Sequence, residues 1–240
     1  MDKSSIFYDK FAQSYSEYSK QKAIYLSAVN KYIIANADKK ASNLIDIGCG
    51  DGFRVKNIAA SLKIKNIFLL DNSVAMLSLC NKLHNAEIIP QDISDKNFNL
   101  NKKFDIVLCL WNVVGHIIEP DARKRALKNI YKMMNNDSVL YIDVNNRYNI
   151  ISYGLVSVIK NIIMDLFFFA HMTGDFDLRI EKEGYFISTK VHIFNPFEIE
   201  KIFKEAGLKI IDRKIIDYST GEQKFSIFSG QLVYKLKINL

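Results

Sequence analysis

The sequence is poor in cysteine, with three in 240 residues: Cys49, Cys80 and Cys109. None of them belongs to a C-x-x-C pair, which argues against a zinc site and against a disulfide framework. This usage is typical of a reducing compartment, so we expect a cytoplasmic protein without a metal site. The first residues, MDKSSIFYDKF, carry charges before any apolar run forms, and no signal peptide is visible.

Arginine is also scarce, because six arginines accompany 27 lysines in a chain with a formal net charge of +7. Specific contacts to phosphates and base edges favour the planar fork of arginine over lysine. No block of like charge stands out in the sequence. The basic balance therefore does not favour a nucleic-acid partner.

Long apolar runs are nearly absent, apart from IISYGLVSVIKNIIMDLFFFAHM at residues 150–172. Lys160 and Asp165 interrupt this run, whereas a membrane-spanning helix needs about 20 predominantly apolar residues. We therefore expect no membrane span, and we interpret the run as a buried helix or as a lid over a pocket.

Apolar strand-like segments alternate with amphipathic helical segments from residue 43 onward. The helical segments have apolar residues at the spacing of one helix face. Strands are expected at 43–46, 66–71, 87–92, 104–110 and 138–144. This alternation indicates a doubly wound α/β fold, in which a mostly parallel sheet is covered on both faces. Ligands of such folds bind at the carboxyl ends of the strands.

The last third of the chain has a different pattern. Residues 175–194 alternate apolar and polar positions on both sides of a charged turn, which predicts a hairpin. A helix should begin at the N-cap Asn195 and stop at Gly207. Two strand-like runs, 208–218 and 225–238, are separated by a turn and should pair antiparallel.

The stretch IDIGCGDGF, residues 45–53, places three glycines directly after the first strand. A dinucleotide fingerprint would need a glycine at Phe53, and a P-loop would need a following lysine. Asp71 ends the second strand, where its carboxylate can accept both hydroxyls of a ribose. Asp92 ends the third strand region, where it can accept from an adenine amino group. The predicted ligand is a nucleoside without dedicated phosphate contacts.

Together, IDIGCGDGF, FLLDNS, PQDI and FDIVLCLWNVVGHI resemble the class I S-adenosylmethionine-dependent methyltransferases. The diagnostic part of this resemblance covers roughly residues 40–145. It implies a Rossmann-like, seven-stranded sheet whose last strand is antiparallel. It also implies S-adenosyl-L-methionine as cofactor and S-adenosyl-L-homocysteine as product.

The resemblance further implies cofactor contacts for eleven residues. Asp46 would lie near the methionine ammonium, with Gly48 and Gly50 along the methionine part. Asp71 would hold the ribose hydroxyls and Asp92 the adenine amino group. The others would flank the adenine, the methyl donor or the open side of the cofactor: Asn72, Met76, Ile93, Leu110, Tyr8 and Tyr15. Met76 could instead be a core residue, and the two tyrosines a packing pair on an amphipathic helix.

His116, just past the fourth strand, is the leading candidate for a general base. It falls where the donor methyl should point, and an imidazole titrates near neutral pH. Asn112 is a candidate for orienting the acceptor. A structural role, with the side chain bonding loop backbone, is the alternative for His116. His171 and His192 are weaker candidates on the inserted segment.

The stretch DVNNRYN, residues 143–149, is unusually polar for a turn after a strand. It predicts that Asn145, Arg147 and Tyr148 line the acceptor pocket, with Arg147 able to bind a carboxylate or phosphate. The alternative is a loop that is anchored by its own hydrogen bonds.

We expect one domain over residues 1–240: a helical lid (1–40), a cofactor-binding core (41–145), an inserted lid helix and hairpin (146–194), and a closing helix and strand pair (195–240). The expected reaction moves a methyl group to N or O of a small-molecule acceptor by in-line displacement in an enclosed pocket. An RNA or protein methyltransferase and a catalytically silent cofactor-binding partner protein are the alternatives. No N-P-P-[YFW] tetrad follows the fourth strand, which counts against base methylation. The chain could act as a monomer or a homodimer.

Overall fold

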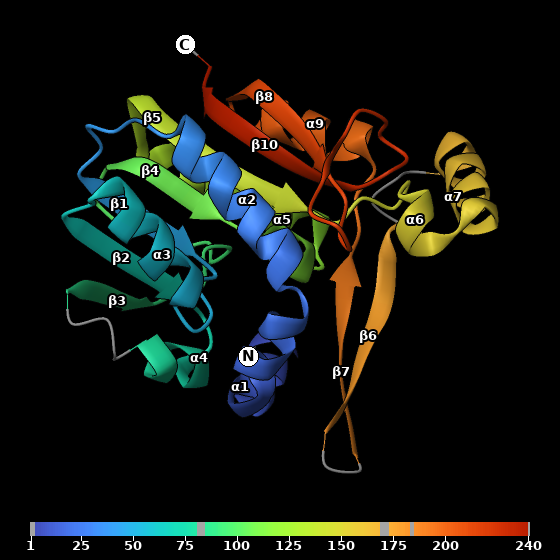
Figure 1. Ribbon diagram of the computed structural model, residues 1–240, viewed down its shortest axis with the longest axis horizontal. Coiled ribbons are helices and arrows are strands. Elements are labelled where there is room, and N and C mark those ends of the chain that lie inside the picture. Colours follow the sequence, from blue (N-terminus) through green and yellow to red (C-terminus); the bar gives the residue numbers. More distant parts are fainter. Residues whose placement is uncertain (1–2, 81–84, 169–172, 183–184, 240) are drawn as a thin grey trace.

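The computed structural model describes residues 3–80, 85–168, 173–182 and 185–239 (Figure 1). Its main sheet has the strand order β3-β2-β1-β4-β5-β10-β8-β9. The strands are β1 Asn43–Ile47, β2 Asn66–Asp71, β3 Ala86–Pro90, β4 Phe104–Cys109, β5 Met134–Val144, β8 Leu208–Ile216, β9 Gln223–Lys224 and β10 Gln231–Ile238.

The first five strands pair in parallel, and β10 lies antiparallel between β5 and β8. The predicted α/β fold with an antiparallel last strand is therefore confirmed, and so is the antiparallel closing pair. The short β9 adds an eighth strand at the edge beside β8. Strand β5 begins at Met134 rather than at the expected Ser138.

Helices cover both faces of the sheet, as the alternating pattern predicted (Figure 1). One face packs against α2 (Ala23–Asn36) and α3 (Phe53–Leu62), and the other against α5 (Pro120–Lys132) and α9 (Pro196–Glu205). Each face has its own apolar core, because successive residues of β1 point to opposite sides. Leu44 belongs to one core, and Ile45 belongs to the other.

Local signals in the sequence explain where these helices begin. The Asn195 side chain accepts a hydrogen bond from the Glu198 backbone amide, with Pro196 in the first turn of α9. The Ser73 side chain likewise caps the short helix α4 (Val74–Leu79) by accepting from the Met76 amide. Both caps satisfy backbone donors that a helix start leaves unpaired.

A hairpin projects from the body beside helix α1 (Lys3–Gln21) (Figure 1). Its strands, β6 (Asp175–Lys182) and β7 (Tyr185–His192), pair antiparallel as expected. Helix α1 packs on β7 through an apolar cluster that contains Phe7, Phe11 and Ile187. The space between α1 and the hairpin therefore has apolar walls.

The described part of the apolar run at residues 150–172 is mostly exposed, so the first of the two interpretations, a buried helix, is wrong, and the lid stays a prediction. The run forms the short α6 (Ile150–Tyr153) and α7 (Leu155–Phe167), while residues 169–172, including His171, lie outside the described residues. Only Val158 of α7 is buried, whereas Val156 is 82% exposed and Phe167 is 77% exposed. None of the described helices is long and apolar enough to cross a membrane.

Polar contacts, rather than its apolar face, fix α7 to the body. The Asp165 carboxylate accepts from Arg147 Nε at 3.0 Å and Nη2 at 2.7 Å. It also accepts from the Tyr148 hydroxyl and the Asn195 amide. Because Arg147 is 1% exposed, this carboxylate neutralises a charge that is fully buried.

We expect Asp165→Ala to lower the free energy of unfolding by about 3–5 kcal/mol, because it leaves a buried guanidinium without its main partner. Lys160→Ala, on the exposed side of the same helix, should change that free energy by less than about 0.5 kcal/mol. Urea denaturation of both variants measures the difference. Equal effects would show that the ion pair does not stabilise the fold.

Candidate active site

A pocket of about 700 Å³ lies at the carboxyl ends of the parallel strands, where the order reverses between β1 and β4. The residues expected around the cofactor line it, with one exception: Tyr8, Tyr15, Gly48, Gly50, Asp71, Asn72, Met76, Asp92, Ile93 and Leu110. The exception is Asp46, which does not reach the pocket surface.

The glycine loop after β1 has no space for side chains. Gly48 and Gly50 have φ values of +65° and +59°, a conformation that favours glycine. A Cβ atom on Gly48 would lie 2.5 Å from a methyl of Val113, and one on Gly50 would lie 2.9 Å from the Tyr15 hydroxyl. The loop is therefore covered on its open side by helix α1 and by the segment after β4.

Asp71 and Asp92 are held by backbone amides at the ends of their strands. Asp71 accepts from the amides of Gly50 at 3.1 Å and Ser73 at 2.9 Å. One oxygen of Asp92 accepts from both the amide and the hydroxyl of Ser94, each at 2.7 Å. A carboxylate has about four acceptor positions, so both side chains keep the capacity to accept from a ligand in the pocket.

Asp46 is a buried carboxylate beside the pocket, with 5% of its surface exposed. Burial raises its pKa to about 7, although the nearby Arg54 partly opposes the shift. No group in the described part of the chain hydrogen bonds to its carboxylate. An unpaired buried acid at this place fits a cationic group of a bound ligand.

Helix α1 covers the pocket because Asp9 fixes it to the start of α4. The Asp9 carboxylate accepts from the Ser73 hydroxyl at 2.6 Å and from the Ala75 amide at 3.2 Å. This contact places Tyr8 and Tyr15, two turns apart on α1, against the pocket. Burial raises the pKa of both phenols, so both hydroxyls remain protonated and uncharged.

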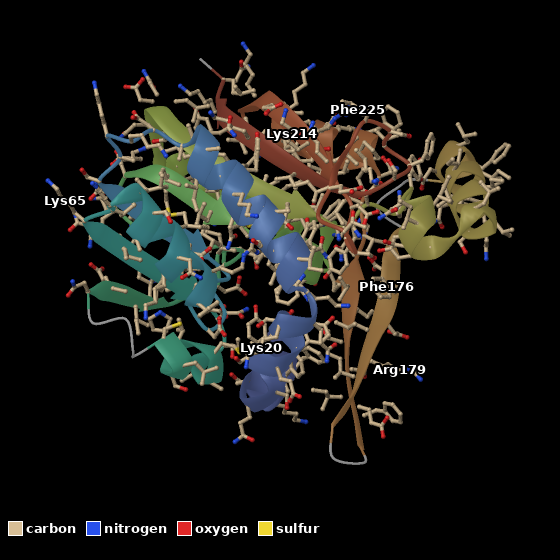
Figure 2. The ribbon with its side chains drawn as sticks, viewed as in Figure 1. Lys20, Lys65, Phe176, Arg179, Lys214 and Phe225 are labelled. Carbon is tan, nitrogen blue, oxygen red and sulfur yellow. The ribbon has the colours of Figure 1, made fainter. Side chains whose placement is uncertain are left out.

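A second cavity of about 890 Å³ lies between α1, the hairpin and the ends of β4 and β5. We call it the chamber. Phe176, at the end of β6 nearest the body, lines it, whereas Arg179 further along points outward (Figure 2). Four residues line both the pocket and the chamber: Tyr8, Tyr15, Trp111 and His116. These four form the boundary between the two cavities.

Trp111 was missed by the sequence analysis, although it is the only tryptophan of the chain. Its φ of 65° is unusual for a bulky residue and is stabilised by its contacts. Its amide donates to Asp143 at 2.6 Å and its indole donates to the Tyr218 hydroxyl at 2.9 Å. Such backbone strain is of order 1–3 kcal/mol and concentrates at functional sites.

His116 lies at the boundary between the pocket and the chamber, and one of its two ring nitrogens forms a hydrogen bond. Its Nε2 is 3.0 Å from the Tyr8 hydroxyl, while its buried Nδ1 has no hydrogen-bond partner among the described residues. Burial lowers its pKa to about 4, so the ring is neutral at neutral pH. It can accept a hydrogen bond there, but it binds a proton only weakly.

Asn112 lines the chamber, and both the nitrogen and the oxygen of its side-chain amide form hydrogen bonds. Its nitrogen donates to the His192 carbonyl at 3.3 Å, and its oxygen accepts from the Asn145 amide at 3.0 Å. It therefore connects the segment after β4 with the end of β5 and with the hairpin. Asn145 itself lines the chamber, as expected.

Arg147 and Tyr148 do not line the chamber, in contrast to the expectation. Both side chains are directed at Asp165, and Arg147 also lies 3.5 Å from Glu198. The loop is anchored by its own polar contacts, which was the alternative interpretation. The reason is that a buried guanidinium requires a carboxylate partner, and α7 and α9 supply two.

His192 is fully buried and does not line either cavity. Its Nδ1 lies 2.6 Å from Asp175, and its Nε2 lies 2.9 Å from Glu198. Asp175 joins the two strands at the base of the hairpin, and Glu198 holds this base against α9. His192 is therefore an anchor rather than a base for the chamber.

We expect Asp46→Asn to raise the Tm of the ligand-free protein at pH 8. Between about pH 4 and pH 7 the folded state holds a proton on Asp46 that the unfolded state has lost, so stability falls as pH rises through this window. The gain in Tm over the wild type should therefore grow from pH 5 to pH 8 in calorimetric scans. A gain that is independent of pH would contradict the raised pKa.

Part of the chain matches a known protein family, and much of it is similar to known proteins. Residues 44–137 match the family model described as a methyltransferase domain. An uncharacterized protein of Methanocaldococcus jannaschii is 26% identical over 210 residues, which cover 85% of this chain and 76% of that protein. A ubiquinone biosynthesis O-methyltransferase of Neisseria meningitidis serogroup C is 24% identical over 201 residues, which cover 82% of this chain and 76% of that protein.

A solved structure shares the fold over nearly the whole chain. It is an S-adenosylmethionine-dependent methyltransferase from Clostridium acetobutylicum, with a TM-score of 0.69 and 21% identity, covering 97% of this chain and 99% of that one. Residues 44–137 therefore form a methyltransferase domain, and the whole chain shares the fold of this solved structure. The domain is of the class I S-adenosylmethionine-dependent type, with S-adenosylmethionine as methyl donor.

Proposed function

We propose that the enzyme transfers the methyl group to a nitrogen or oxygen of a small molecule that is enclosed in the chamber. The observation that carries this proposal is the shared boundary of the two cavities. Tyr8, Tyr15, Trp111 and His116 line both of them. A donor in the pocket and an acceptor in the chamber are thus held side by side, and such alignment supplies much of the rate of a displacement.

The residues of the pocket fit the donor by their chemistry. When bound, S-adenosylmethionine supplies an electrophilic methyl group on a sulfonium. In our proposal, Asp71 and Asp92 use their remaining acceptor positions for the ribose hydroxyls and the adenine amino group. The unpaired Asp46 carboxylate then compensates the charge of the methionine ammonium.

The chamber supports a small acceptor rather than a macromolecule. Helix α1 and the hairpin form opposite walls of the chamber, and its lining is mainly apolar and aromatic with a few polar groups, as in small-molecule sites. The Neisseria relative is named for an O-methylation in ubiquinone biosynthesis, which supports an acceptor of this class. An enclosed site also excludes water from the reacting atoms.

We assign His116 the role of accepting a hydrogen bond from the nucleophile. An ammonium must lose a proton before its nitrogen has a lone pair to attack, and a hydroxyl attacks better when a base accepts its proton. The free Nδ1 of His116 is neutral at working pH, since burial holds its pKa near 4. In this role the ring carries its proton on Nε2, which donates to the Tyr8 hydroxyl 3.0 Å away, and Nδ1 is the acceptor.

His116→Ala should lower kcat by about 100-fold, the lower limit for loss of a positioned acid–base group. The Kd of S-adenosylhomocysteine should change little, because the main proposed contacts of the cofactor lie on other residues. Tyr8→Phe, which keeps the ring but removes the hydroxyl, should lower kcat less. Stopped-time assays measure kcat, and calorimetry measures the Kd of S-adenosylhomocysteine. Parallel losses in kcat and cofactor affinity would show that His116 only packs against the donor.

The function is tested by following S-adenosylhomocysteine formation with phenols, amines, hydroxy acids and sugars, with RNA and unfolded protein in parallel. We expect turnover with a small acceptor, and its loss in Asp71→Asn, which keeps the shape of the side chain but lacks its charge. Methyl incorporation into RNA or protein, with none into any small molecule, would refute the proposal.

A further inference from the structure

We infer that the acceptor is a carboxylic acid with a flat, mostly apolar body, and that Lys22 and Gln231 bind its carboxylate in the chamber. The inference rests on the proposed function, because it names the substrate class of the same site. Its basis is the set of polar groups that the chamber leaves free.

The chamber walls are mainly aromatic and aliphatic. The rings come from α1, α6, the segment after β4, the hairpin and the segment after β8: Phe7, Tyr8, Phe11, Tyr15, Tyr18, Trp111, Tyr153, Phe176 and Tyr218. Leu178, Ile180 and Val191 add aliphatic surface from the hairpin. Such a lining favours a flat apolar molecule, because rings stack and exclude water.

Lys22 is the only charged residue among the described residues that line the chamber. It connects α1 with α2, and its ammonium lies 5.9 Å from the Tyr18 ring centre and 5.5 Å from that of Tyr218. Both rings line the chamber, so they hold the ammonium at its wall. No carboxylate of the described chain forms an ion pair with it.

Gln231 supplies a second free donor. It is 3% exposed, and its Oε1 accepts from the Asn146 backbone amide at 2.6 Å. Because a backbone amide can only donate, the oxygen must face Asn146, and the Nε2 group is the free one. Within the described residues, no acceptor pairs with this nitrogen.

The charge balance of the chamber favours an anion over a cation. None of the described lining residues is acidic, so a cationic acceptor would meet Lys22 without a counter-ion. A carboxylate would instead pair with the ammonium and accept from an amide, and hydrogen bonds between charged groups are roughly twice as strong as neutral ones. Its apolar body would extend along the aromatic walls, leaving the nucleophile near His116.

The test compares acids with their uncharged amides: the isomers of hydroxybenzoate and aminobenzoate against hydroxybenzamide and aminobenzamide. Trp111 is the sole tryptophan and lies on the chamber wall, so quenching of its fluorescence reports Kd in the complex with S-adenosylhomocysteine. We expect at least one acid to bind about tenfold more tightly than its amide. Lys22→Met should remove that advantage, a loss of about tenfold for the acid and none for the amide.

One further variant is a control for net charge, and another tests the second donor. Lys20→Met removes a lysine from α1 that does not line the chamber (Figure 2), and it should leave both Kd values unchanged. Gln231→Glu keeps the oxygen that accepts from Asn146, but it replaces the free donor with a carboxylate oxygen. It should weaken acid binding and leave amide binding nearly unchanged.

The inference is overturned if amides bind as tightly as acids, if Lys22→Met shifts both equally, or if no acid quenches Trp111. Its failure can be told from failure of the proposed function. Methylation of neutral acceptors that is insensitive to Lys22→Met would retain the function and refute the inference. Absence of transfer to any small molecule would refute both.

Discussion

The buried carboxylate of Asp143 connects the segments from which the site is built. It accepts from the Trp111 amide at 2.6 Å and from the Tyr25 hydroxyl at 2.7 Å, so it links β5, the segment after β4 and helix α2. Burial raises its pKa, because these two donors only partly replace water. This acceptor supports the left-handed backbone at Trp111, while the Tyr218 hydroxyl and the stacked ring of Tyr18 hold the indole at the boundary between the two cavities.

A second polar network links α7, α9 and the base of the hairpin. Arg147 pairs with Asp165 of α7 and with Glu198 of α9, and Glu198 also contacts His192 at the end of the hairpin. Buried ion pairs contribute little net stability compared with apolar packing, but each is strongly destabilising to break. The network therefore determines position: it fixes the base of the hairpin, while the hairpin's apolar side chains face α1.

The parallel core could be predicted because its signals are local. The apolar segments that became β1 and β2 end in Asp46 and Asp71, and in a parallel sheet such ends meet at one edge. This reasoning brought ten cofactor candidates to the wall of one pocket.

Other features depend on contacts that no local pattern records. The direction of Arg147 was decided by carboxylates on α7 and α9, far along the chain. The apolar side of α7 faces outward because its polar residues Asp165 and Asn161 face the body, where they bind Arg147. The importance of Trp111 depends on its positive φ, which the sequence pattern around a tryptophan does not indicate.

The unpaired carboxylate of Asp46 has a consequence for how binding of the donor in the pocket depends on pH. Near neutral pH, this group is divided between its two protonation states. In the proposed binding mode, the donor's ammonium favours the ionised state, so loading the enzyme expels a proton from a site that water hardly reaches. Lowering the pH would then release the donor from the pocket without changing the acceptor chamber. The coupling between pH and donor binding would reside in the Asp46 side chain.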